Sequence, residues 1–307
     1  MSHPFGTLHL IVNPASGNGA AKKCLPQLRS LLDTHGIEHE VHLTRGSGDA
    51  TRMAREVATD HRYLAAVGGD GTIHEVVNGL LHDDGTPVRD DAVMAVISAG
   101  SGGDFARTYG LDLPMEQLVR RHLTTTDTLA CDAGLVTFDL DGVKTTRFFV
   151  NIAEVGWGAE VVRRAERLPR FVGRVRYLLA AWGAIRAVNR QEVTLTLDHT
   201  EAQVPLVELV VANGQWFGGG MKVAPRALPD DGLLNVLAFT GGRSQVFVLT
   251  PKLYQGEHLP NPEIAEWQSS TVHLAPADPM LVEADGEVLG RTPARFSIIS
   301  RPLTIKI

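Results

Sequence analysis

The segment Gly68-Gly69-Asp70-Gly71-Thr72 has the composition of a loop that approaches a phosphate group closely. Three glycines in four positions permit unusual backbone conformations and bring main-chain N–H groups near a ligand. Asp70 offers a carboxylate for which no packing role is expected, and Thr72 offers a hydroxyl that can cap a following helix. The segment lacks the lysine of a Walker A loop and the spacing of a dinucleotide-binding loop. A plain Asp-Gly turn explains one pair of these residues but not the whole cluster.

Three further loops of the first 107 residues carry similar chemistry. One begins at Asn13 and continues Pro-Ala-Ser-Gly-Asn-Gly, a second begins at Thr44, and a third contains Ser101 and Asp104. Small residues in such loops leave room for an anion beside a helix N-terminus. The Asn13 loop taken alone could equally be an ordinary strand–helix turn. The four loops together predict a nucleotide pocket.

Two acidic clusters lie in the second half of the chain, Leu228-Pro229-Asp230-Asp231-Gly232-Leu233 and Glu283-Ala284-Asp285-Gly286-Glu287. Carboxylates together with turn carbonyls suit a hard cation such as Mg²⁺. Phosphoryl transfer also needs a carboxylate that orients or deprotonates the acceptor hydroxyl. A solvated turn is the alternative explanation for each cluster.

The elements that must position these loops change in character along the chain. In the first hundred residues, short apolar runs alternate with helical periodicity, which predicts a parallel sheet covered by helices on both faces. Ligands of such sheets bind at the carboxyl ends of the strands. The predicted strands are 8–12, 37–43, 63–67 and 93–97, with helices near 20–32, 49–58 and 73–81.

From about residue 127 the pattern is mainly β, typical of a sandwich or barrel. Its predicted strands include 129–137, 145–152, 204–212, 294–299 and 303–307. A helical stretch is predicted at 160–188, where Pro169 and Gly173 are expected to break it, and a second helix at 244–254. We therefore predict an α/β domain over 1–127 and a β-sandwich domain over 128–307. A return of the last strand to the first domain is left open.

The composition of the chain limits the classes of molecule that it is expected to bind. A net charge of −6 argues against general nucleic-acid binding. Residues 163–190, however, carry eight arginines and one glutamate among aromatic and aliphatic side chains. Such a segment either lies on an anionic membrane surface or packs on the sandwich with its arginines in water.

A cytoplasmic protein without disulfides is expected, because no signal peptide or membrane span is apparent and the two cysteines lie far apart. Peripheral contact with the inner face of the membrane is left open, as is a homodimer. The histidines are scattered singly and predict neither a metal site nor a hydrolytic triad.

The motifs, taken in order, resemble the diacylglycerol kinase catalytic-domain family, which includes sphingosine and ceramide kinases and bacterial lipid kinases. GGDGT alone is shared with NAD kinases and, more loosely, with phosphofructokinases, whereas the ordered set is specific to the lipid kinases. The matching stretches are NPASG at 13–17, VGGDGT at 67–72, GSGGDFAR at 100–107, VANG at 211–214, GGGMKVAPRALPDDGLLNV at 218–236 and EADGE at 283–287.

This resemblance implies an NAD-kinase/phosphofructokinase-like ATP domain, a C-terminal β-sandwich and an active site in the cleft between them. Asp70 and Asp104 would belong to the Mg²⁺ and water network around the phosphates. Glu287 would be the general base for a lipid hydroxyl, ranked above its neighbour Asp285. The ATP site would be lined by Asn13, Thr44, Gly68, Gly69, Asp70, Gly71, Thr72 and Ser101, and a structural Mg²⁺ would be held by the carbonyls of Leu228 and Leu233 with the carboxylate of Asp231.

One departure from the family concerns the third loop, which usually reads Gly-Thr-x-Asn-Asp-Phe-Ala. Here Ser101 replaces the threonine and Gly103 replaces the asparagine, and losing that amide puts nucleotide affinity in question. An NAD-kinase-like transferase and a non-catalytic nucleotide or lipid sensor are the alternatives to a lipid kinase. The sequence does not rank diacylglycerol, monoacylglycerol, phosphatidylglycerol and sphingoid bases as acceptors.

Overall fold

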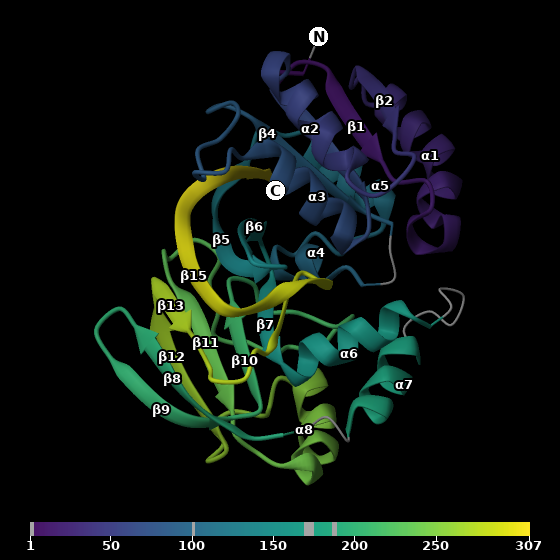
Figure 1. Ribbon diagram of the computed structural model, residues 1–307. Coiled ribbons are helices and arrows are strands. Elements are labelled where there is room, and N and C mark those ends of the chain that lie inside the picture. Colours follow the sequence, from purple (N-terminus) through teal and green to yellow (C-terminus); the bar gives the residue numbers. More distant parts are fainter. Residues whose placement is uncertain (1–2, 100–101, 169–174, 186–188) are drawn as a thin grey trace. The chain divides into compact units, whose positions relative to one another are not determined.

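The computed structural model describes residues 3–99, 102–168, 175–185 and 189–307 (Figure 1). The chain forms two compact units. The first, the α/β unit, comprises Met1–Asp132 and Ser300–Ile307. The second, the β-rich unit, comprises Ala133–Ile299.

The α/β unit is built on a parallel sheet with strand order β2-β1-β3-β4-β15. Every residue of β1 and β3 is buried, which explains their uninterrupted apolar sequences and confirms the predicted parallel sheet. The last strand joins β4 through the pair Ile305–Met94. The strands are β1 (Leu8–Val12), β2 (His39–Leu43), β3 (Tyr63–Gly68), β4 (Val93–Ser98) and the end of β15 (Glu287–Lys306).

Helices follow each of the first three strands: α1 (Ser16–Thr34), α2 (Asp49–Asp60) and α3 (Asp70–Leu80). The helices α2 and α3 pack closely, since a Cβ at Gly79 would overlap the Thr51 carbonyl. Thr51 Oγ1 also donates to the carbonyl of Glu75 at 2.9 Å. The sequence did not predict α4 (Asp104–Thr108), α5 (Met115–Leu118) or the π-helical turn η1 (Val119–Leu123), because such short elements show no helical periodicity.

The β-rich unit has an antiparallel sheet in the order β12-β11-β10-β7-β14-β15, and β13 joins β15 to the hairpin β8–β9. Its core buries aromatic and aliphatic side chains from these strands. Among them, the rings of Phe149 and Phe296 meet edge to face with a centroid separation of 6.4 Å. Its elements are β5 (Thr128–Leu140), β6 (Val143–Phe149), β7 (Ile152–Gly156), α6 (Trp157–Glu166), α7 (Val175–Ala184), β8 (Gln191–Leu197), β9 (Glu201–Leu206), β10 (Glu208–Ala212), β11 (Leu234–Phe239), α8 (Arg243–Gln255), β12 (Ile264–Ser269), β13 (Thr271–Leu274), β14 (Leu281–Ala284) and most of β15.

Three predicted strand boundaries are wrong. The run 145–152 contains the end of β6 and the start of β7, and the run 204–212 contains β9 and β10 separated by Val207. Conversely, 294–299 and 303–307 belong to one strand, β15, although Arg301 has a positive φ of 54°. Hydropathy does not reveal such breaks, because they depend on hydrogen bonds to distant residues.

The predicted helical stretch 160–188 overlaps two helices, α6 and α7, and its residues 169–174 and 186–188 lie outside the described part of the chain. None of the helices in the described ranges is long and apolar enough to cross a membrane.

Candidate active site

Main-chain hydrogen bonds hold the carboxyl ends of the four strands β1 to β4 together. The strand ends are joined by Asn13 N to Val67 O (3.0 Å), Thr44 N to Val12 O (2.9 Å) and Ala99 N to Gly68 O (2.7 Å). The loops that begin at Asn13, Thr44 and Gly68 therefore share one edge of the sheet. The third loop, which contains Ser101 and Asp104, leaves that edge at Ala99, while Ser101 lies outside the residues described.

Asp70 connects two of these loops. Its Oδ2 accepts a hydrogen bond from Gly103 N at 2.9 Å, and its Oδ1 accepts one from Phe105 N at 3.1 Å. The carboxylate thus lies at the start of α4, where the main-chain amides favour negative charge. A Cβ at Gly102 would overlap Asp70 Oδ2, which explains the glycine there. The expectation that Asp70 has no packing role is therefore wrong, because it orders the third loop.

Thr72 has a different role from the one predicted for it. The helix α3 begins at Asp70 with Gly69 as its N-cap residue, so Thr72 lies inside the first turn. Its side chain is buried and packs against Gly68, where a Cβ would overlap Thr72 Oγ1. Thr72 N also donates to the Gly69 carbonyl at 2.9 Å. The side chain of Thr72 thus fixes the turn between β3 and α3.

Gly103 adopts a left-handed conformation with a φ of 73°. Asparagine tolerates this region better than most residues other than glycine, so the family's asparagine and this chain's glycine suit the same backbone. The next residue, Asp104, is buried and forms an ion pair with Arg107 Nη1 at 2.9 Å. The replacement at 103 therefore preserves the backbone that presents Asp104.

Two other glycines of this edge have no structural explanation within the described protein. Gly46 and Gly71 lack a positive φ, and, apart from adjacent residues and the backbone of the same helix, no described atom lies within 4 Å of a Cβ built at either position. A side chain would be tolerated there unless another molecule occupies the space. This open, glycine-lined edge therefore fits a nucleotide phosphate approaching the backbone.

Asp285 lies in the β-rich unit, where it is buried and accepts hydrogen bonds from the main chain. Its carboxylate accepts from Val150 N (2.9 Å), Asn151 N (2.9 Å) and Ile152 N (3.2 Å). Asn213 of the VANG stretch supports the same segment, since its Nδ2 donates to the Val150 carbonyl at 3.0 Å. Both carboxylate oxygens of Asp285 are therefore engaged in separating β6 from β7.

Glu287 begins β15 and pairs with Ala284 across a tight turn that contains Gly286. Unlike Asp285 it is half-exposed. Its place at a strand end with solvent access suits a carboxylate that exchanges a proton.

The turn that contains Leu228, Asp231 and Leu233 precedes β11. Asp231 is exposed, and its Oδ1 accepts a hydrogen bond from Leu233 N at 3.0 Å. Gly232 reverses the chain with a φ of 74°. Because the turn offers a carboxylate and carbonyl oxygens, its donors are of the type that Mg²⁺ prefers.

Sequence reasoning missed Glu154 and Glu208, which are buried in the same β-rich unit as Glu283 of the second acidic cluster. Glu154 and Glu283 are direct neighbours on β7 and β14, and Glu208 on β10 accepts a hydrogen bond from Gly158 N. Burial raises the pKa of Glu154 to about 8. Burial, followed by the charge of Glu154, also raises the pKa values of Glu208 and Glu283. The signal was available, because each glutamate interrupts an apolar strand.

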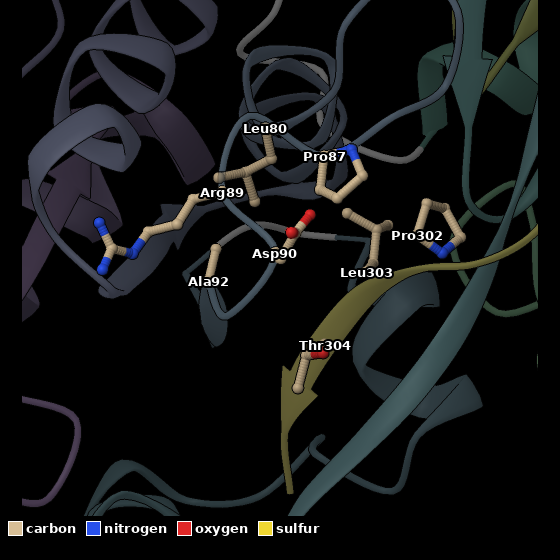
Figure 2. A pocket seen from close by; sticks show the side chains of 8 residues that line it. All are labelled: Leu80, Pro87, Arg89, Asp90, Ala92, Pro302, Leu303 and Thr304. Atoms are coloured by element: carbon tan, nitrogen blue, oxygen red, sulfur yellow. The ribbon is translucent and has the colours of Figure 1, made fainter.

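A small pocket lies elsewhere in the α/β unit (Figure 2). Pro87, Arg89 and Leu303 are among the residues that line it, and Ala92 places it beside the start of β4. It is therefore at the opposite end of β4 from the glycine-rich loops and adds nothing to the nucleotide site.

Comparison with known proteins covers both parts of the chain. The family "Diacylglycerol kinase catalytic domain" matches residues 7–136, and the family "YegS C-terminal NAD kinase beta sandwich-like domain" matches residues 151–307. A diacylglycerol kinase of Bacillus subtilis (strain 168) is 28% identical over 299 residues, covering 96% of this chain and 94% of the relative. A diacylglycerol kinase of Mycobacterium tuberculosis (strain ATCC 25618 / H37Rv) is 28% identical, covering 99% and 96% respectively.

The fold agrees with these matches. The crystal structure of a diacylglycerol kinase from Bacillus anthracis str. Sterne superposes with a TM-score of 0.73 at 22% sequence identity, covering 97% of this chain and 96% of that one. The resemblance inferred from the ordered motifs is confirmed, and the chain belongs to the diacylglycerol kinase catalytic-domain family.

Proposed function

We propose that this protein is a lipid kinase that transfers the γ-phosphate of ATP to the hydroxyl of diacylglycerol or a related lipid, with Mg²⁺. The observation that carries the proposal is the glycine-lined edge of the parallel sheet, where Asp70 orders the start of α4. Relatives that match over nearly their whole length are named diacylglycerol kinases, which supports a lipid as the phosphate acceptor.

In this proposal the loops at the sheet edge bind the nucleotide. Gly71 leaves space for the phosphates, and Asn13, Thr44 and Gly68 are held beside it by the hydrogen bonds between strand ends. Bound Mg²⁺ would neutralise charge on the transferred phosphoryl group. Asp104, next to the ordered loop, would contribute to holding that ion.

Acceptor activation is assigned to Glu287, which would take the proton of the lipid hydroxyl. Asp285 is a positioning residue, since both of its oxygens already accept main-chain hydrogen bonds. The oxygen donors of the turn around Asp231 would hold a second, structural Mg²⁺ close to the start of β11.

A lipid acceptor must be collected from a membrane, and we propose α7 and α8 of the β-rich unit for this contact. Trp182 on α7 is 63% exposed and Phe247 on α8 is 50% exposed, yet their rings meet edge to face at 5.5 Å. By contrast, Arg163 and Arg164 both form ion pairs with Glu160. The aromatic pair is therefore a better membrane contact than these two arginines.

The decisive experiment measures transfer of labelled γ-phosphate from ATP/Mg²⁺ to diacylglycerol, monoacylglycerol, phosphatidylglycerol, a sphingoid base and NAD⁺. We expect a phosphorylated lipid with the wild type and with Glu192→Gln, an exposed glutamate of the same unit. We expect transfer by Glu287→Gln to be slower by about 10²–10⁴-fold.

Other outcomes distinguish the alternatives. Phosphorylation of NAD⁺ without a lipid product would favour an NAD-kinase-like transferase. ATP binding without transfer to any acceptor would favour a nucleotide sensor.

A further inference from the structure

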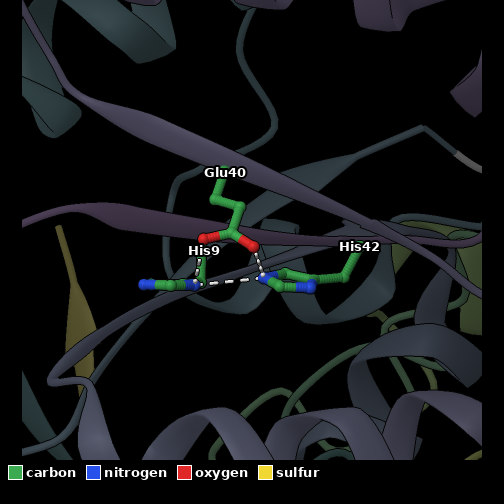
Figure 3. A group of neighbouring side chains, drawn as sticks. All are labelled: His9, Glu40 and His42. Atoms are coloured by element: carbon green, nitrogen blue, oxygen red, sulfur yellow. Dashed lines mark hydrogen bonds and ion pairs between the residues drawn. The ribbon is translucent and has the colours of Figure 1, made fainter.

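Two histidines and a glutamate that the proposed kinase reaction does not use come together on the first two strands of the α/β unit. His9 lies on β1 opposite Glu40 on β2, and His42 follows two residues later on the same face of β2. His9 Nδ1 lies 3.0 Å from His42 Nε2. Of the two Glu40 carboxylate oxygens, Oε2 lies 3.9 Å from His9 Nδ1 and Oε1 lies 3.8 Å from His42 Nε2 (Figure 3).

These distances fit a shared cation. Zn²⁺ bonded to nitrogen or oxygen at ~2.0–2.2 Å in a tetrahedron separates neighbouring ligand atoms by roughly 3.3 Å. The separation of 3.0 Å between the two ring nitrogens is close to that value, and each of the two nitrogens has a Glu40 oxygen within 3.9 Å. In Figure 3 the two facing ring nitrogens and the carboxylate enclose one small space.

The surroundings favour a built site over a chance meeting of surface side chains. His9 is buried, and the ring of His61 packs against it with a centroid separation of 4.0 Å, which limits its rotation. The side chain of Glu40 is 61% exposed, so an ion can enter from solvent and keep a water ligand. Two neutral imidazoles and a carboxylate suit Zn²⁺ better than Mg²⁺, which prefers oxygen alone.

We propose that His9, Glu40 and His42 bind a divalent transition ion, Zn²⁺ in the first instance, which cross-links β1 to β2. Within the α/β unit β2 is the edge strand, paired to β1 alone in the described structure. The ion would hold its register and thereby steady the strand ends that carry Asn13 and Thr44.

The test uses tag-free, full-length protein stripped of metal and kept in millimolar Mg²⁺, so that oxygen-ligand sites are occupied by the hard ion. Zn²⁺ is titrated against a chromophoric chelator. We expect one equivalent bound by the wild type, and at least tenfold weaker binding by His42→Gln and by Glu40→Gln. Both substituted side chains reach solvent, so the fold should survive. His35→Gln, an exposed histidine of the same unit, should bind as the wild type does.

Two further measurements identify the ligands. Zn²⁺ should raise the melting temperature of the wild type but not that of His42→Gln. Co²⁺ should give the visible bands of a four-coordinate nitrogen and oxygen site. A thiolate-to-cobalt band would assign the ion to a cysteine and overturn the proposal. Zn²⁺ binding that is absent, or unchanged in both variants, would also overturn it, leaving a proton shared between the two histidines.

Discussion

Asp285 and Glu287 are two residues apart, and the structure separates their roles. Asp285→Asn would place an amide N–H against a main-chain N–H, because all three partners of the carboxylate are donors. We expect the free energy of unfolding to fall by about 1–3 kcal/mol, measured by urea denaturation. Glu287→Gln should change it by less than ~0.5 kcal/mol but lower kcat by about 10²–10⁴-fold. Equal stability losses in the two variants would contradict this division.

In the third loop, a side chain is disfavoured at Gly102 and at Gly103 for different reasons. At Gly103 only the positive φ is restrictive, so Gly103→Asn should cost less than ~1 kcal/mol and Gly103→Val about 1–2 kcal/mol. At Gly102 the obstacle is Asp70 Oδ2, so Gly102→Ala should displace that carboxylate and raise the KM for ATP. Thermal unfolding and initial rates at varied ATP check both. An unchanged KM in Gly102→Ala would show that the loop ordered by Asp70 does not contribute to ATP binding.

For single residues, the sequence motifs identified which carboxylates belong to the candidate site. They did not predict which groups Asp70 and Asp285 contact. A pattern such as Asp-Gly-Glu has the same letters whether its aspartate faces solvent or accepts main-chain hydrogen bonds. Those bonds come from residues 33 to 135 positions away, which no local pattern reveals.

Among the elements, β1, β3 and β4 of the α/β unit were predictable because each is a continuous apolar run of a buried parallel sheet. The β-rich unit was less predictable, because β6 and β7 are separated where the Asp285 side chain binds the backbone and not where hydropathy changes. The short helix α4 escaped prediction for a related reason: Asp70, a residue of another loop, accepts a hydrogen bond from Phe105 N in its first turn.

We predict that the helices α7 and α8 contact the membrane. Trp182→Ser together with Phe247→Ser removes two exposed aromatic side chains without emptying a core position. We expect severalfold weaker sedimentation with anionic lipid vesicles and a matching loss of activity on vesicle-borne lipid. Activity on a short-chain, water-soluble acceptor should be unchanged. Leu140→Ser, an exposed apolar residue of β5, is the control. Equal binding by the double variant and the wild type would exclude this surface.

For the molecule as a whole, net charge does not show how the acidic residues are divided between the buried core and the surface. The sequence carries 35 acidic and 29 basic residues, and several of the acids are buried in the β-rich unit. Composition could not predict this, because it counts Glu154 and an exposed glutamate alike. Burial makes ionised Glu154 costly, so its neutral form is favoured in the folded state.

Stability should therefore depend on pH through these glutamates. The pKa of Glu154 is about 8 in the folded state against 4.5 ordinarily, so the unfolded chain releases its proton first as pH rises. The stabilisation is complete below pH 4.5 and is lost progressively up to about pH 8. Glu154→Gln cannot titrate, so its advantage over the wild type should grow from pH 5 to pH 8 by about 2–4 kcal/mol in urea denaturation. Exposed Glu192→Gln should follow the wild type throughout, and a constant difference between Glu154→Gln and the wild type would mean that Glu154 is ionised in the folded protein.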